Sequence, residues 1–215
     1  MIDRFTRSSA RLGVLAVALA ALLAGCAGAP PKPIGKPNRA AWQQRLAKLQ
    51  TLSDWRLSGR IAVVNGSHGS SGSLVWFENA PRFEMRLAGP FGIGGFRLYG
   101  TANGLFIDTG DETRYTSDPA HFLARQLGGP LPVNSLRYWA LGMPDPGSPT
   151  RQITVDQDGL LRHLEQNGWS IDYDRFTTTQ HGWTLPTRLE AHRGQVKLKL
   201  VVEDWHVPAG TVILD

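Results

Sequence analysis

Apolar and polar residues alternate one by one through much of this chain, and this pattern constrains its fold more than any other feature. Segments 82–87 and 195–200 both alternate apolar residues with Arg, Glu, Lys or Gln. A period of two is typical of antiparallel strands that bury one face and expose the other. Further runs begin near positions 57, 74, 96, 105, 153, 160 and 169. About ten or eleven short strands predict a mainly β (α+β) fold, either a large curved sheet or an open antiparallel barrel.

Three segments have a helical pattern instead. Residues 38–51 begin with Asn38, a residue type favoured at helix N-caps, and then place apolar residues on one helical face. Segment 117–127 opens with Ser-Asp-Pro, and segment 134–141 opens with Asn and ends at Gly142. Because helices as short as the last two are marginal alone in water, we expect them to pack on the sheet as a lid. The residues expected to hold this lid are Phe122, Leu123, Leu136 and Trp139.

The amino-terminal segment has the features of a secretory signal. Arginines at positions 4, 7 and 11 precede an apolar run over 12–23, and two small residues then precede Cys26, the sole cysteine. An apolar run of about a dozen residues is too short to span a bilayer, which takes roughly 20. The string Leu-Ala-Gly-Cys at 23–26 resembles a bacterial lipobox, which implies cleavage before Cys26 and lipid on its thiol. We therefore expect a signal peptide over 1–25, a lipid-bearing Pro/Gly-rich tether over 26–38 and one domain over 39–215.

Charge and motifs point away from nucleic acid and from catalysis. The chain has 23 basic and 18 acidic residues, and loss of residues 1–25 leaves 20 and 17, a net charge of +3 without a basic cluster. The six histidines are scattered and no metal-binding motif occurs, so we expect neither metal nor cofactor. The segment most similar to the GxSxG motif of a catalytic serine is Gly-Ser-Ser-Gly at 69–72, which we expect in a flexible Gly/Ser turn. The sequence predicts a binding protein.

The inward positions of the alternating runs are the candidates for an apolar cavity. A half-open sheet with helices across one side can leave a concave apolar site of the kind that lipid-like ligands occupy. Periodicity alone leaves open whether these side chains line a hollow or close on one another as a filled core. The candidate lining residues are Leu57, Ile61, Phe83, Met85, Leu87, Phe96, Leu98, Val196, Leu198 and Leu200.

One loop is a candidate membrane contact. Residues 89–95 place Phe91 between Pro90 and Gly92, in a stretch with four glycines. An apolar residue at such a tip either folds back onto the sheet or is exposed, and an exposed one often marks a membrane or partner contact.

Several short motifs together resemble the LolB family of outer-membrane lipoprotein receptors. No single motif is diagnostic, but their order and spacing extend over nearly the whole mature chain. They are Leu23-Ala24-Gly25-Cys26, Trp55 with Gly59-Arg60-Ile61, Gly72-Ser73-Leu74-Val75-Trp76, Leu87 with Gly89-Pro90-Phe91-Gly92, Leu131-Pro132-Val133-Asn134-Ser135-Leu136 with Trp139 and Gly142, Gln166-Asn167-Gly168-Trp169, and Trp205.

The resemblance implies a fold and a role. It implies an unclosed barrel with a helical lid and a cavity for acyl chains, and a monomer that takes lipoproteins from the periplasmic carrier LolA and inserts them into the outer membrane. It implies cleavage before Cys26, a lipid anchor there, and an outer-membrane location facing the periplasm, since Ala27 rather than Asp follows. In the family a leucine occupies the loop position of Phe91, so the resemblance makes Phe91 the membrane-inserting residue.

Two other functions remain as alternatives. A structural lipoprotein with a filled core could scaffold an outer-membrane complex. A lipid-modifying hydrolase would need a catalytic dyad, which the sequence motifs do not provide.

Overall fold

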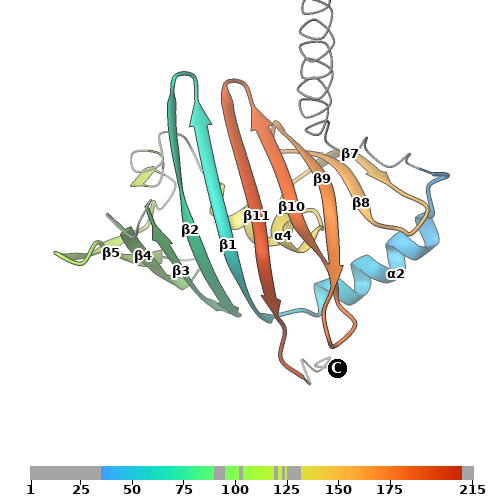
Figure 1. Ribbon diagram of the computed structural model, residues 1–215, viewed down its shortest axis with the longest axis horizontal. Helices are drawn as coiled ribbons and strands as arrows, with labels where there is room; N and C mark the ends of the chain where they lie inside the picture. Colours follow the sequence, from blue (N-terminus) through green and yellow to red (C-terminus); the bar gives the residue numbers. More distant parts are fainter. Residues whose placement is uncertain are drawn as a thin grey trace, which may run out of the picture. The chain divides into compact units, whose positions relative to one another are not determined.

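Two helices and an eleven-stranded sheet make up the part of the chain that the structure, a computed structural model, describes: residues 35–89, 95–101, 104–118, 121–122, 124 and 132–209. Figure 1 shows their arrangement. In chain order the elements are α2 (Arg39–Gln50), β1 (Asp54–Asn65), β2 (His68–Asn79), β3 (Arg82–Ala88), β4 (Gly95–Thr101), β5 (Gly104–Asp108), β6 (Thr113–Thr116), α4 (Val133–Leu141), β7 (Thr150–Val155), β8 (Leu161–Gln166), β9 (Trp169–Thr178), β10 (Thr184–Arg193) and β11 (Val196–His206).

The sheet consists of two antiparallel meanders, the first from β1 to β6 and the second from β7 to β11, which are joined at their long strands β1 and β11. Its order is β6-β5-β4-β3-β2-β1-β11-β10-β9-β8-β7, so the first and last strands of the chain pair in the middle. The edge strands β6 and β7 do not pair with each other, which leaves the sheet open. The open antiparallel architecture expected from the alternating pattern is therefore confirmed.

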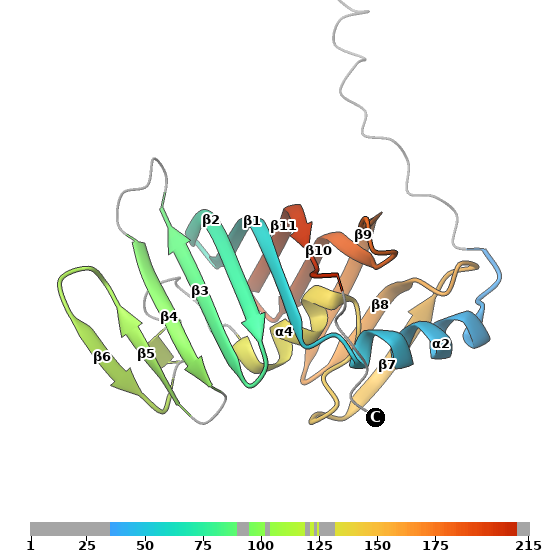
Figure 2. The ribbon, with the colours of Figure 1, turned by 90° about the horizontal axis from the view of Figure 1, so that it is seen from below.

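The connection from one edge of the sheet to the other places α4 on its concave face. Chain leaving β6 must cross to β7 at the far edge, and α4 lies on that route, within the curve of the sheet (Figure 2). The helix begins one residue earlier than expected, at Val133, and ends at Gly142, whose φ of 79° is accessible to glycine without strain. Of the helix expected over 117–127, the structure describes residues 117, 118, 121, 122 and 124, and the last three of these are helical.

Helix α2 packs across the turns at the ends of β7 to β10. Asn38 caps it as expected, because its side chain accepts a hydrogen bond of 3.0 Å from the Ala41 amide. The Asn38 amide donates to Asp156 O in the β7–β8 turn at 3.0 Å. At the other end, Lys48 Nζ donates to Gly182 O at 3.0 Å and lies 4.7 Å from the Trp183 ring centroid. Both ends of the helix are thus fixed to the second meander.

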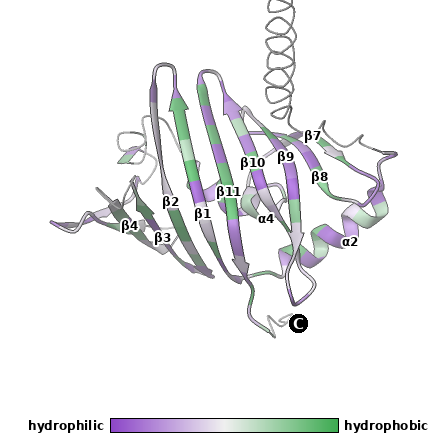
Figure 3. Cartoon of the chain, in the orientation of Figure 1, coloured by the Kyte–Doolittle hydropathy of each residue, from purple (hydrophilic) through white to green (hydrophobic). Residues whose placement is uncertain are grey.

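Strands β1, β3 and β11 alternate buried and more exposed residues as the sequence predicts, whereas β6 and β7 do not. Figure 3 shows the change between hydrophobic and hydrophilic residues along the long strands. Two strands were not expected: β6, which is short and polar, and β10, which contains Pro186. The register between β9 and β10 shifts just after Pro186, where the ladder tolerates a residue without an N–H. The prediction of a turn at 69–72 is wrong, because these residues lie in strand β2. A Cβ added at Gly72 would lie 2.2 Å from Ala88 O on the neighbouring strand, so the strands leave no room for a side chain there.

Candidate functional site

The ten predicted lining residues lie together on the inner face, the side of the sheet that carries α4. Nine are at most 9% exposed, and Phe96 is half-buried against the same core. Whether any of them contacts a ligand stays a prediction. Of the predicted lid residues, Leu136 and Trp139 are fully buried in this core and Phe122 packs against it.

A polar network centred on Gln166 holds α4 to the second meander. The Gln166 Oε1 atom accepts hydrogen bonds of 2.9 Å from Trp139 Nε1 and from the Asp145 amide. Its Nε2 atom donates to the carbonyls of Asp145 and Ser148, both at 2.9 Å. Gln166 is 1% exposed, so these bonds satisfy polar groups that have no access to water.

A buried ion pair holds α4 to the first meander. Glu78 follows Leu74 and Trp76 at an inward position of β2 and is 2% exposed. Its Oε1 atom forms an ion pair with Arg137 Nη2, although the two groups are not aligned for a hydrogen bond. Its Oε2 atom accepts a hydrogen bond of 3.1 Å from Trp76 Nε1. Burial raises the pKa of Glu78 to about 7, and Arg137 and the Trp76 hydrogen bond partly oppose that shift.

Tryptophans fill the middle of the concave face. The ring of Trp55 lies 5.2 Å from that of Trp76 and 5.5 Å from that of Trp205, centroid to centroid. Trp205 donates its indole N–H to Pro186 O at 2.8 Å. Together with Trp139 of α4, these rings make this region a packed core.

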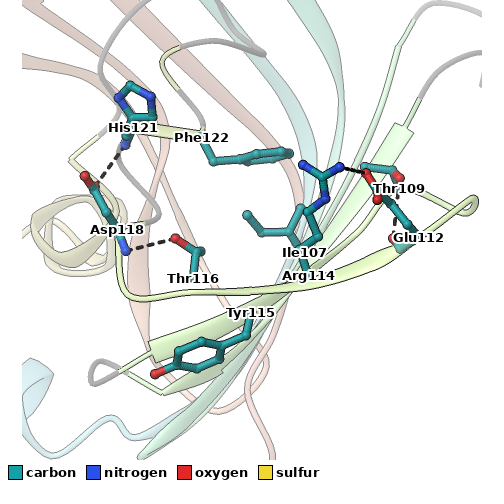
Figure 4. Close-up of a pocket in the computed structure, with 9 residues that line it drawn as sticks. All are labelled: Ile107, Thr109, Glu112, Arg114, Tyr115, Thr116, Asp118, His121 and Phe122. Carbon is teal, nitrogen blue, oxygen red and sulfur yellow. Dashed lines mark hydrogen bonds and ion pairs between the residues drawn. The ribbon is translucent and has the colours of Figure 1, made fainter.

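A cleft opens at the β6 edge of the sheet. It has a volume of about 440 Å³, within the range of about 300–1,000 Å³ typical of ligand pockets. Figure 4 shows the side chains of Ile107, Phe122 and Arg114 converging on it, whereas Tyr115 points away on the other side of β6. The full lining is Ile107, Thr109, Glu112, Arg114, Tyr115, Thr116, Asp118, His121 and Phe122.

This cleft has an apolar floor and a polar rim. Ile107 is 4% exposed, and Phe122 makes an edge-to-face contact with Phe96 at a centroid distance of 5.4 Å. At the rim, Arg114 pairs with Glu112 at 2.7 Å and both side chains are more than half exposed. Such a cleft suits an amphipathic ligand with an apolar chain and a polar head. None of the ten predicted lining residues lines it, and Phe96 is linked to it only through its contact with Phe122, the one predicted lid residue in the lining.

Several predicted site residues lie outside the described part of the chain: Cys26, Pro90, Phe91, Gly92 and Leu123. Sequence reasoning missed Ile107, Arg114, Glu78 and Gln166. Leu74, Trp76 and Glu78 alternate along β2, and this period could have shown that the carboxylate of Glu78 faces the inner side of the sheet. No comparable signal marks Arg114, because it lies on a short polar strand.

The described residues hold no group of three or more His, Cys, Asp or Glu able to bind a metal ion. Within the same residues, neither helix is long and apolar enough to cross a membrane.

Comparison with known proteins gives the family of the chain. Residues 53–205 match the family described as "Outer membrane lipoprotein LolB". The chain belongs to the LolB family. Outer-membrane lipoprotein LolB of Pseudomonas putida KT2440 is 36% identical over 190 residues, which cover 87% of this chain and 92% of the relative. That of Pseudomonas paraeruginosa PA7 is 35% identical over 194 residues, covering 89% and 94%.

Solved structures share the fold at much lower identity. A putative outer-membrane lipoprotein-sorting protein domain from Vibrio parahaemolyticus gives a TM-score of 0.52 at 9% identity, covering 80% of this chain and 92% of that one. A LolA-superfamily protein from Nitrosomonas europaea gives 0.50 at 8% identity, covering 78% and 93%. These likenesses concern the fold alone.

Membership in the LolB family confirms the resemblance found in the sequence. The chain is an outer-membrane lipoprotein receptor, anchored by lipid and facing the periplasm, and it is not an enzyme.

Proposed function

We propose that this chain, acting as a monomer, takes lipoproteins from the carrier LolA and holds an acyl chain in the cleft at the β6 edge before inserting the lipoprotein into the outer membrane. The observation that carries this assignment is the apolar floor formed by Ile107 and Phe122 beneath a polar rim. Acyl carbons lie against the floor, and the polar head stays beside Arg114 and His121.

Hand-over of this kind needs no catalytic group. An acyl chain that moves between two apolar sites and then into a bilayer exposes little apolar surface to water, so no large hydration barrier arises. The bilayer is the final acceptor, because it buries every methylene of the chain. Direction then follows from stronger burial at each step.

Two parts of this proposal rest on the sequence. Lipid on Cys26 keeps the domain at its delivery surface. Phe91, between Pro90 and Gly92, enters the acyl layer and opens a path for the incoming lipoprotein. Phenylalanine is large and apolar enough for that role.

A two-stage assay tests the proposal. A fluorescent lipoprotein bound to LolA is mixed with the lipid-anchored protein, first alone and then in vesicles, and acceptance and insertion are measured separately. We expect Phe91→Glu to accept lipoprotein normally and to lose insertion, whereas Phe91→Leu retains both steps. Failure of the unaltered protein to accept lipoprotein would refute the proposed function, and normal insertion by Phe91→Glu would refute the role of the loop.

A further inference from the structure

Four aromatic side chains, together with Arg56 and Glu84, form one continuous row across the outer face of the first meander, the face opposite α4. The strand registers pair Arg56 with Phe77, Phe77 with Glu84, Glu84 with Tyr99, Tyr99 with Phe106, and Phe106 with Tyr115. We call these six residues, Arg56, Phe77, Glu84, Tyr99, Phe106 and Tyr115, the outer row. It extends from β1 to the edge strand β6.

The outer row exposes apolar surface where a strand face in water normally carries polar residues. Phe106 is 43% and Tyr115 is 63% exposed, and they are two of the four exposed large hydrophobic residues of the described chain. A shallow groove of about 390 Å³ lies along the row, lined by Phe77, Tyr99 and Phe106 together with Arg82. Exposed aromatic patches of this kind mark contact with a partner or a membrane.

Arginines outnumber carboxylates around the row, and two of the four arginines form ion pairs. Arg86 pairs with Glu84 at 2.5 Å, and Arg97 pairs with Asp108 at 3.0 Å.

Arg56 and Arg82 form no ion pair with any residue that the structure describes. Arg56 instead lies 5.0 Å from the Phe77 ring centroid, and Arg97 lies 4.5 Å from that of Tyr99. The four arginines stand against three carboxylates, Asp54, Glu84 and Asp108, which leaves one positive charge in excess. Aromatic rings flanked by arginines match the interface of a bilayer that contains anionic lipid.

We propose that the outer row is a second membrane contact, which holds the outer face of β2 to β6 against anionic phospholipid. The aromatic side chains lie at the level of the headgroups, and Arg56 and Arg82 bind lipid phosphates. The inference rests on the proposed function only for its purpose, because the contact itself depends on the row.

The position of the row gives this contact its use. Tyr115 belongs to the outer row, and its neighbours Arg114 and Thr116 on β6 line the acyl cleft from the opposite face of the strand. The row and the cleft therefore meet at β6. Strands β3 and β4, which carry the middle of the row, are also the strands that flank the loop of Phe91. A domain docked through the row therefore opens its cleft next to the bilayer, and an acyl chain has only one short strand to cross.

A site-specific label tests the contact in the lipid-anchored protein. Cys26 is the only cysteine of the sequence and is predicted to carry the lipid, so an engineered cysteine is the only free thiol. A nitroxide is attached in Tyr115→Cys and, as a control, in His192→Cys, which is exposed on the outer face of β10. Its accessibility to oxygen and to a water-soluble nickel reagent is measured in vesicles of phosphatidylethanolamine with phosphatidylglycerol.

We expect the label at position 115 to favour oxygen over nickel by about ten-fold relative to the label at 192, a difference of about 1.4 kcal/mol. Replacing Arg56 and Arg82 by Glu should abolish this difference, as should vesicles of phosphatidylcholine alone. Equal nickel accessibility at 115 and 192 in the anionic vesicles would overturn the proposal. So would a label at 115 that responds only when LolA is added, because the row would then be a protein-binding surface.

Failure of the membrane contact and failure of the proposed function are separable. A protein that shows the depth difference but accepts no lipoprotein retains the contact and loses the function. A protein that transfers lipoprotein with an aqueous label at 115 does the reverse.

Discussion

Arg137 of α4 forms an ion pair with the buried carboxylate of Glu78 on β2. Two residues further along the helix, Trp139 donates to Gln166 on β8 at 2.9 Å. These two strands belong to different meanders, which otherwise pair only through β1 and β11. Helix α4 is therefore a brace across the concave face, and it limits how far the open sheet can flex.

The raised pKa of Glu78 predicts how stability changes with pH. Between the unfolded value of 4.5 and the folded value of about 7, the unfolded chain loses the proton first, so stability falls as pH rises. At 1.4 kcal/mol per pH unit the loss is about 3 kcal/mol above pH 7. We expect Glu78→Gln to match the unaltered protein near pH 4.5 and to exceed its free energy of unfolding at pH 8, measured by urea denaturation.

The matched control for this experiment is Glu84→Gln on the outer face of β3. Its side chain is 27% exposed and pairs with Arg86, so its substitution should not reproduce the gain of stability expected for Glu78→Gln. A Glu78→Gln protein whose stability has the same pH dependence as that of the unaltered protein would show that burial does not raise the pKa of this carboxyl.

Removing the amide of Gln166 should release α4 from β8. Gln166→Leu leaves the buried Trp139 indole N–H and the Asp145 amide without acceptors, which costs about 3 kcal/mol of unfolding free energy. Hydrogen exchange within α4 should rise accordingly. Gln152→Leu, the same change at an exposed site on the neighbouring strand β7, should cost less than about 0.5 kcal/mol. Equal effects of the two changes would contradict the bracing role.

Two glycines separate backbone strain from helix docking. Gly159 and Gly182 have φ values of 69° and 74°, so Ala is strained at both. An added Cβ at Gly159 would lie 2.7 Å from the Trp42 amide nitrogen of α2, whereas at Gly182 it would meet nothing within 4 Å. Gly182→Ala should therefore cost about 1 kcal/mol and Gly159→Ala clearly more, with protease cleavage appearing in α2 only for the latter. Similar losses without cleavage would place the docking of α2 elsewhere.

The alternating pattern was sufficient to predict the sheet because burial and strand geometry share its period of two. It assigned Leu57, Met85 and Leu200 to the inner face correctly, and Asn38 marked the start of α2 correctly. Strand β10 was not predicted because a proline such as Pro186 normally argues against a strand. The register shift that accommodates it depends on the pairing with β9, which the local sequence does not show.

The cleft was harder to predict because its walls are distant in sequence and its rim is polar. Arg114 and Thr116 face it from a four-residue strand without an apolar period, and Phe122 reaches it from the segment that follows. Periodicity identifies an inward side chain but not the space in front of it. The position of the cleft follows from how β5, β6 and residue 122 are placed in three dimensions.

Binding of an acyl chain in this cleft is the central claim, and a pair of substitutions on β6 tests it most directly. Thr116 lines the cleft, whereas Thr113 lies on the opposite, exposed face of the same strand. The protein is titrated with a fluorescent fatty-acyl probe. We predict saturable binding near one probe per chain, retained by Thr113→Trp and weakened at least about ten-fold by Thr116→Trp, which fills the cleft. No saturable binding, or equal affinity in the two variants, would contradict the account.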